Sequence, residues 1–425
     1  MAHKNGDADV EAPLLAAAAS DDDNPSSSAA AGSSFALACT LAASLASIIY
    51  GYNRGVMSGA QKFVQSDLGI TDAQIEVLIG ATSIYSLISP PASRGFLSSI
   101  PEIAGNSGIL LSYIADFALA GFPPSLNWRL MIGIGAVPPL FLAAAAILAM
   151  PETPRWLVLH GHHDAALRVL LRTTSGDSPL AHLRLHQIIS SAKASTSPSP
   201  SSSPWRDIAT PSVRRVAVAI LGLQFFQQAC GVSALVLYAP RVFHLAGVTS
   251  ESGELAATAL LGLTKTAAIV IPLFLADRLG RRPMLLTSAA AMSLSLLALA
   301  ASFSLGLSSS ISVAAAAAFM AAFSVGFGPV IWMYGSEILP LRLRAQGTGI
   351  GTAANRVMSA VVGMSFISVY EAIGMAATFY LFAAFAAAAW VFVYAFLPET
   401  KGRSLEEMEA LFADKPPATA TAAAT

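Results

Sequence analysis

Residues 257–276 read ATALLGLTKTAAIVIPLFLA and residues 284–305 read MLLTSAAAMSLSLLALAASFSL, with only DRLGRRP (277–283) between them. Each apolar run has the length of about 20 residues that an α-helix needs to cross a bilayer. The short loop concentrates charge between the two runs. This arrangement predicts a helical hairpin in a membrane, with its loop in water.

The composition of the whole chain agrees with this interpretation. Of 425 residues, 55% are hydrophobic and 12% are charged, and the mean hydropathy is +0.62. The net charge of -1 and the absence of aromatic-basic interleaving exclude nucleic acid as an expected partner. The two cysteines, Cys39 and Cys230, lie in apolar runs. We expect both to be buried, with no disulfide framework or zinc site.

Extending the same criterion along the chain predicts an all-α polytopic membrane protein with about ten spans. The second span is doubtful, because Ile75 to Ser89 would rise only about 22 Å. The candidate spans are 35–58, 73–89, 103–120, 130–150, 216–237, 257–276, 284–305, 311–333, 347–370 and 374–397.

The distribution of positive charge orients these spans. With the N-terminus in the cytoplasm, sixteen Lys and Arg residues of the loops and the C-terminal tail fall inside, whereas Lys62, Arg129 and Arg241 fall outside. This bias supports the orientation. It also places the polar stretch 151–215 in the cytoplasm as a helical linker that ends in the flexible STSPSPSSSP.

Five regions follow from this topology. We expect a disordered cytoplasmic tail without a signal peptide, an N-terminal transmembrane bundle, the linker, a C-terminal bundle of six helices and a second cytoplasmic tail. Their boundaries are 1–33, 34–150, 151–215, 216–397 and 398–425.

The two bundles carry the same marker residues in the same order, which indicates an internal repeat. A proline stands four residues before an arginine in each half, at Pro90 and Arg94 and at Pro340 and Arg344. The next PET motif follows after 57 residues in the first half (94 to 151) and 54 in the second (344 to 398). Upstream, 124 residues (216 to 340) compare with only 56 (34 to 90). The shortfall of 68 residues is enough for about two spans and part of a third.

The motifs DRLGRRP, PETPRWL, QFFQQACG, GPVIWMYGSEILPLRLRAQG and PETKGRSLEE, in this order, resemble the sugar porter family of the major facilitator superfamily. GVMSGA and the KT pair before DRLGRRP are most similar to its plant polyol and monosaccharide transporters. The resemblance implies a two-bundle fold of twelve spans. In this chain the end of span two, span three and span four would then be missing from the N-terminal half.

A polyhydroxylated substrate needs amides and hydroxyls near the middle of the membrane. By resemblance, Gln227 and Gln228 are principal sugar ligands, although helix–helix hydrogen bonding is an alternative role. Ser233 stands where the family has Asn or Asp. The remaining substrate-binding candidates by resemblance are Trp332, Asn355 and Glu102, the last in place of a glutamine; Glu102 could instead pair with a buried cation.

The DRLGRRP loop can clasp carboxylates at neighbouring helix ends and so form a cytoplasmic gate. As an alternative, it only anchors the topology. The resemblance gives the gate two charge clusters, one in each half. They comprise Glu152 and Arg155, and Asp277, Arg278, Arg281, Glu337 and Arg344.

Asn53 stands where proton-coupled relatives have an aspartate, and an amide cannot titrate. The adjacent Arg54 is costly at span depth unless it snorkels or faces an aqueous cavity. The family's basic partner for the aspartate lies on the span that this chain lacks. The sequence therefore gives little support to proton coupling.

The predicted function is alternating-access transport of sugars or sugar alcohols, by proton symport in the family, with no cofactor beyond a possible proton gradient. A second hypothesis is a transport-inactive truncated product that acts, if at all, by association with intact relatives. An enzyme is least favoured. His162, His163 and Asp164 are accompanied by no candidate nucleophile and lack the spacing of a metal site.

The expected partners are the substrate and the lipid bilayer, with the oligomeric state open. Family analogy favours the plasma membrane over the vacuolar membrane.

Overall fold

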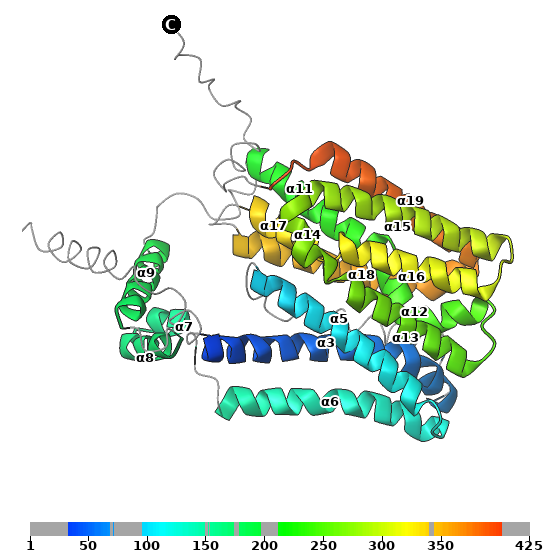
Figure 1. Ribbon diagram of the computed structural model, residues 1–425, viewed down its shortest axis with the longest axis horizontal. Coiled ribbons are helices and arrows are strands. Elements are labelled where there is room, and N and C mark those ends of the chain that lie inside the picture. Colours follow the sequence, from blue (N-terminus) through cyan, green and yellow to red (C-terminus); the bar gives the residue numbers. More distant parts are fainter. Residues whose placement is uncertain are drawn as a thin grey trace, which may run out of the picture. The chain divides into compact units, whose positions relative to one another are not determined.

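The computed structural model describes residues 33–68, 71, 96–148, 152, 154–173, 178–196, 211–339 and 344–401. Every regular element in these ranges is a helix (Figure 1). The chain divides into two compact units, and the larger one consists of residues 44–141 and 201–425. The predicted tail 1–33 and the doubtful span 73–89 lie outside the described residues, apart from Ser33.

Three long helices form the described part of the N-terminal half. They are α3 (Ser33–Leu68), α5 (Phe96–Leu119) and α6 (Pro124–Leu148). They include most of the predicted spans 35–58, 103–120 and 130–150. Each extends beyond the apolar run at one end or more, because a polar end can continue a helix into water.

Glycines let α3 and α5 approach each other closely. Gly51, Gly55 and Gly59 recur every four residues and therefore share one face of α3. A Cβ atom built on Gly51 would lie 1.8 Å from the carbonyl oxygen of Gly105, and one on Gly55 would lie 2.0 Å from Ser112 Oγ. Small residues in this spacing are how helices pack without side chains between them in a bilayer. A bulkier residue at either position would push the helices apart.

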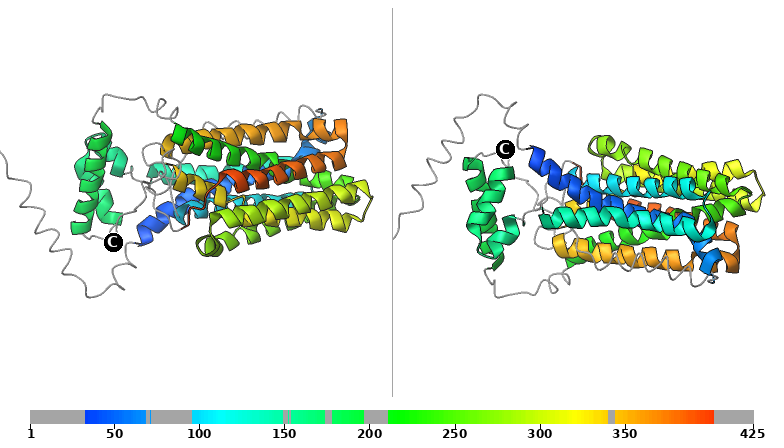
Figure 2. Two further views of the ribbon diagram at one scale, coloured as in Figure 1. Left: turned by 90° about the horizontal axis from the view of Figure 1, so that it is seen from above. Right: turned by 90° about the horizontal axis from the view of Figure 1, so that it is seen from below.

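The C-terminal half contains nine helices among the described residues. α15 packs along α16 and α19, and α11 packs along α18, as the left view in Figure 2 also shows. The helices are α11 (Pro211–Ala229), α12 (Val232–Leu245), α13 (Glu251–Ala268), α14 (Ile271–Leu279), α15 (Arg281–Ser304), α16 (Ser309–Val325), α17 (Val330–Ile338), α18 (Arg344–Ile373) and α19 (Met375–Phe396).

The span predicted at 216–237 is not one uninterrupted helix. It is divided at Gly231, whose φ of 84° lies in the left-handed region that favours glycine. A Cβ atom there would lie 2.4 Å from the ring of Phe382. The continuous hydropathy of the run conceals this break, because a glycine among apolar residues does not end a hydrophobic pattern.

Two further predicted spans are also broken. The run 257–276 is divided at Ile269 and Val270, so that α13 and α14 replace a single helix. The run 311–333 is interrupted between α16 and α17, where Gly326, Gly328 and Pro329 lie. Proline cannot donate a backbone hydrogen bond and glycine weakens a helix. These breaks leave backbone carbonyls available inside the bundle.

The core of the C-terminal half is aromatic and aliphatic. Phe319, Phe327 and Phe379 are fully buried, and Phe366 stacks on Phe382 with ring centroids 6.3 Å apart. The outer faces are apolar as well: Leu294 is 68% exposed. Such a surface suits lipid tails better than water. Among the described residues, five helical segments are long and apolar enough to cross a membrane.

The linker predicted at 151–215 is helical at its start. It forms α7 (Pro154–Leu159), α8 (His163–Thr173) and α9 (Ser178–Thr196). Leu157, Val158, Ala166 and Val169 make a small apolar core of their own. This segment therefore folds as a compact unit rather than as a plain tether.

Candidate functional site

A network of amide side chains joins α11 to α18 inside the C-terminal half. Asn355 on α18 donates from Nδ2 to Gln227 Oε1 at 2.6 Å and to Gln224 Oε1 at 2.9 Å. Gln227 in turn donates to the carbonyl oxygens of Phe327 and Gly328, both at 2.9 Å. Those carbonyls are accessible because the helix is interrupted between α16 and α17. All three amide side chains are buried.

The network continues through Gln228 to two serines. Gln228 donates to Asn355 Oδ1 at 3.3 Å and accepts from Ser233 Oγ at 2.5 Å. Ser233 Oγ and Ser359 Oγ lie 2.9 Å apart. The break at Gly231 turns the chain so that Ser233, on α12, faces Gln228 on α11. Gln224, Gln227 and Gln228 share one face of α11, as residues three and four apart do.

Arg54 brings the N-terminal half into this network. Its Nη2 donates to Ser233 Oγ at 2.6 Å and to Ser359 Oγ at 3.2 Å, and its Nη1 donates to Tyr50 Oη at 3.2 Å. Arg356 on α18 also donates to Tyr50 Oη, and its guanidinium lies 5.0 Å from the centre of the Tyr50 ring. A guanidinium at the centre of a span costs about 2.5–3.5 kcal/mol on insertion scales. Hydrogen bonds to these hydroxyls offset part of that cost.

Asn53, the neighbour of Arg54, points away from the network. Its side chain is exposed. A Cβ atom built on Gly135 of α6 would lie 2.7 Å from Asn53 Oδ1, so the amide lies against α6. The residue that faces the polar network from this turn of α3 is therefore Arg54.

A second polar cluster lies at the end of the C-terminal bundle, around the start of α15. Arg281 donates from Nε and Nη2 to Glu337 Oε1 at 3.1 and 2.8 Å. Thr400 donates to the other oxygen, Glu337 Oε2, at 2.6 Å. This cluster fastens α15, α17 and the segment after α19 to one another, as a clasp of charged and polar groups would.

Glu399 caps the N-terminus of α15. Its carboxylate accepts from the backbone N–H groups of Arg281 and Arg282 at 2.9 and 3.0 Å, and from those of Thr400 and Lys401 at 3.0 and 2.9 Å. Desolvation by itself raises the pKa of the Glu399 carboxyl, but these four backbone N–H groups together lower it below its usual range. An anion at a helix N-terminus also interacts favourably with the helix dipole. Gly280 leaves room for it, since a Cβ atom there would lie 2.9 Å from Glu399 Oε2.

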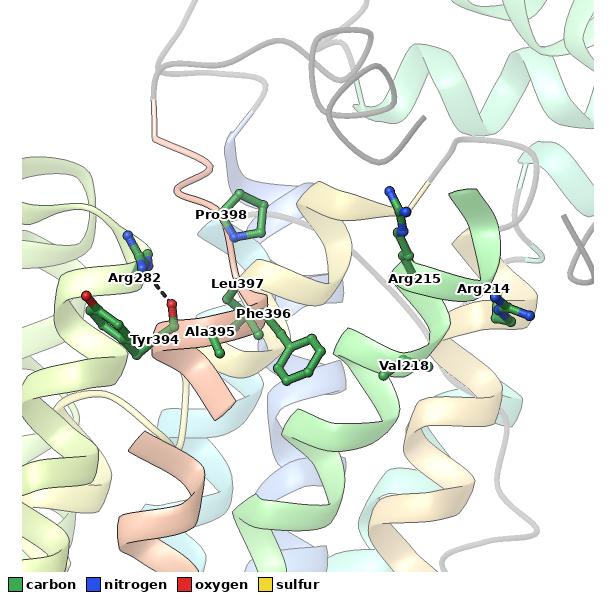
Figure 3. A pocket seen from close by; sticks show the side chains of 9 residues that line it. All are labelled: Arg214, Arg215, Val218, Arg282, Tyr394, Ala395, Phe396, Leu397 and Pro398. Atoms are coloured by element: carbon green, nitrogen blue, oxygen red, sulfur yellow. Dashed lines mark hydrogen bonds between the residues drawn. The ribbon is translucent and has the colours of Figure 1, made fainter. Parts of the chain in front are cut away.

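A cavity of about 570 Å³ opens beside this cluster (Figure 3). Arg282 stands at one side and donates to the carbonyl oxygen of Tyr394 at 2.8 Å, while Arg214 and Arg215 come from α11. Arg214 precedes Gln227 by 13 residues, or about 20 Å of helix. The cavity is therefore separate from the amide network.

The comparisons with known proteins fit this geometry. A model of the family described as "Sugar (and other) transporter" matches residues 77–412. The chain belongs to the sugar transporter family. "Polyol transporter 5" of Arabidopsis thaliana is 39% identical to this sugar transporter, over 89% of this chain and 86% of the relative. The "Arabinose-proton symporter" of Escherichia coli strain K12 is 32% identical, over 84% and 79%.

Solved structures give the same fold. The inward-open structure of the xylose transporter XylE from E. coli matches this sugar transporter with a TM-score of 0.70 and 21% identity, over 88% of this chain and 99% of that chain. The proton:xylose symporter XylE bound to 6-bromo-6-deoxy-D-glucose matches with the same score over 90% and 100%. The predicted major facilitator fold is thereby confirmed, and the protein is a sugar porter of that superfamily.

The structure brings together four of the six predicted substrate-binding residues of this sugar transporter. Gln227, Gln228, Ser233 and Asn355 form the network described above. Trp332 is half-buried on α17, and no hydrogen bond in the described part of the chain ties it to them. Glu102 belongs to α5, but its side chain lies outside the described residues.

Of the seven predicted gate residues, Arg281 and Glu337 make an ion pair. Arg278 is exposed, and its carbonyl oxygen accepts from Lys401 Nζ at 2.5 Å. Glu152 is exposed. The side chains of Arg155, Asp277 and Arg344 lie outside the described residues.

Sequence reasoning missed several members of both sites of the sugar transporter. In the network they are Tyr50, Gln224, Arg356 and Ser359, and in the cluster they are Glu399 and Thr400. The spacing of Gln224 from Gln227 and of Ser359 from Asn355 was available as a signal, since both are helical steps of three or four residues. The capping role of Glu399 needs the packing of α15 against the segment after α19, which no local pattern encodes.

Proposed function

We propose that this chain transports sugars or sugar alcohols across a membrane by alternating access. The observation that carries the proposal is the buried network of Gln227, Gln228, Ser233 and Asn355. Amides and hydroxyls in the interior of an apolar bundle can replace the water that hydrates a polyol. The names of the relatives, a polyol transporter among them, support the same substrate class.

Access to the network alternates in this proposal between two sides. The cluster of Arg281, Glu337 and Glu399 closes one end and opens when its hydrogen bonds break. The positive-inside bias of the sequence supports placing that end in the cytoplasm. We also propose that the chain has the five regions expected from its sequence. We propose in addition that it resides in the plasma membrane.

We also propose that the N-terminal half is shortened, so that the whole chain has about ten spans. The alignment with the Arabidopsis Polyol transporter 5 runs over 469 positions. The aligned 89% of this chain is only about 378 of its 425 residues. About 91 positions of the alignment therefore hold a residue of the relative and none of this chain. A Bacillus subtilis relative is aligned over 388 positions with about 366 residues of this chain, but this alignment covers only 82% of that relative. The plant alignment covers more of its relative and supports the gap.

Uptake of labelled sorbitol, mannitol, glucose and myo-inositol by transporter-deficient yeast tests the proposal. The chain should give saturable uptake, and Asn355→Ala should weaken its apparent affinity by about tenfold or more, because buried partners lose their hydrogen bonds. Ser365→Ala is the matched control, since among the described residues that hydroxyl donates to the carbonyl oxygen of Val361 in its own helix and to no other group. Uptake equal to that of empty cells, from a chain present at the surface, would instead favour a transport-inactive product.

Addition of an uncoupler separates the two modes of transport. Symport, as in the arabinose-proton relative, makes uptake sensitive to the uncoupler. Facilitated transport is indifferent to it. We propose symport as the mode, with its proton-binding group elsewhere than at Asn53, whose amide cannot titrate.

A further inference from the structure

We propose that the central network binds an anionic substrate, a polyol that carries a carboxylate, with Arg54 and Arg356 as the groups that hold the carboxylate. This inference rests on the proposed function, because it assumes that the network is the substrate site. It goes beyond that function by naming the charge of the substrate and the residues that select it.

The two guanidinium groups meet at one hydroxyl. Arg54 on α3 and Arg356 on α18 both donate to Tyr50 Oη. Arg54 also reaches Ser233 and Ser359, which belong to the network of amides. Two positive charges from opposite halves of the chain therefore stand beside the groups that would bind substrate hydroxyls.

Their hydrogen-bond partners are neutral hydroxyls, whereas three other arginines pair with carboxylates. Arg281 pairs with Glu337, Arg129 with Asp67 and Arg241 with Glu371. In the part of the chain that the structure describes, no carboxylate comes within ion-pair distance of Arg54 or Arg356.

A carboxylate on the substrate would supply the missing negative charge. The planar fork of a guanidinium matches the two oxygens of a carboxylate, and such charged hydrogen bonds are roughly twice as strong as neutral ones. The amides of Gln228 and Asn355 remain for the hydroxyls of the same molecule. With a neutral polyol bound, neither arginine would have an ion-pair partner among the described residues, and an unpaired charge inside an apolar bundle is expensive.

The test compares two ligands of nearly the same shape, glucuronate and its neutral amide, glucuronamide. Binding of each labelled compound to the purified full chain in detergent is measured, together with uptake of both and of sorbitol in yeast. Glucuronate should bind at least about tenfold more tightly than glucuronamide, as expected for hydrogen bonds to a charged group. Because Arg54 and Arg356 are only half-buried, the affinity for glucuronate should also fall modestly as salt is raised, and that for the amide should not.

Variants assign the effect to the arginines. Arg54→Gln should remove the preference for glucuronate, and Arg54→Lys should keep part of it. Arg129→Gln, which removes an arginine from an exposed ion pair with Asp67, should leave the preference unchanged. If Arg54→Gln does not fold, the comparison of the two ligands and the salt series on the unaltered chain decide the matter.

Preferred binding of glucuronate that depends on Arg54 supports the inference. Binding or uptake of sorbitol and glucuronamide without a preference for glucuronate overturns it and leaves the proposed function standing. If none of these compounds binds or enters, both the inference and the proposed function are overturned.

Discussion

Arg54 Nη2 on α3 lies 2.6 Å from Ser233 Oγ on α12, a hydrogen bond that spans 179 residues of sequence. The same serine donates to Gln228 Oε1 at 2.5 Å. Ser233 is fully buried, and its hydroxyl connects the two halves of the chain through these two hydrogen bonds. It ties a charged group of one half to the amides of the other.

Ser233→Ala should therefore lower stability. The substitution leaves Gln228 Oε1 and part of the Arg54 guanidinium without a partner, which costs about 1–3 kcal/mol for buried groups. Thermal unfolding of the purified chain in detergent, followed by tryptophan fluorescence, measures the effect against Ser365→Ala. Unfolding temperatures that are equal in the two variants would mean that the hydrogen bond contributes nothing.

The ion pair of Arg281 and Glu337 should show energetic coupling. The side chains are 12% and 30% exposed, so solvent screens the pair only partly. Arg281→Gln and Glu337→Gln, alone and together, should give a coupling energy of about 1 kcal/mol in a double-mutant cycle of unfolding. Additive effects of the two substitutions would contradict a direct clasp.

Acid should loosen the cluster at the start of α15. The pKa of Glu399 is lower in the folded protein than its ordinary value of 4.5. Its ionised form therefore stabilises the fold above about that pH, and the contribution is lost as the pH falls through the folded pKa. Stability measured over a pH series should decline more steeply in the parent chain than in Glu399→Gln. Parallel curves below pH 4.5 would exclude Glu399 as the group responsible.

Asp116 is the carboxylate that we expect to matter for proton coupling. It is buried on α5, accepts from Gly59 N–H at 3.2 Å through Oδ2, and has no partner for Oδ1 among the described residues. Ionisable groups inside membrane helices commonly mark proton pathways. Asp116→Asn should bring uptake at acidic outside pH close to that at neutral pH. An unchanged ratio of the two rates would rule this carboxylate out.

The sequence predicted the fold class because hydropathy and charge are local quantities. Apolar runs of about 20 residues locate helices, and the run at 374–397 agrees with α19 to within one residue at each end. The hydropathy of the sequence did not predict the helix breaks at Gly231 or at Ile269 and Val270. A helix break inside the bundle depends on what packs there, as the ring of Phe382 against Gly231 illustrates.

The candidate site was predicted in part for a similar reason. The amides of Gln227 and Gln228 stand out because polar residues are rare in apolar runs. The position of Arg54 in the network could not be read from the sequence, which also allowed the side chain to snorkel toward water. Its contact with Ser233 joins α3 to α12 across 179 residues of sequence, and no local pattern encodes that pairing.

The most direct test of sugar or polyol transport is counterflow in proteoliposomes that contain only the purified 425-residue chain. Vesicles loaded with unlabelled sorbitol or glucuronate are diluted into a trace of the same labelled compound. The proposed transport should give a transient accumulation of label that Asn355→Ala reduces and Ser365→Ala does not. No accumulation of either compound, from chain shown to be folded and inserted, would contradict it.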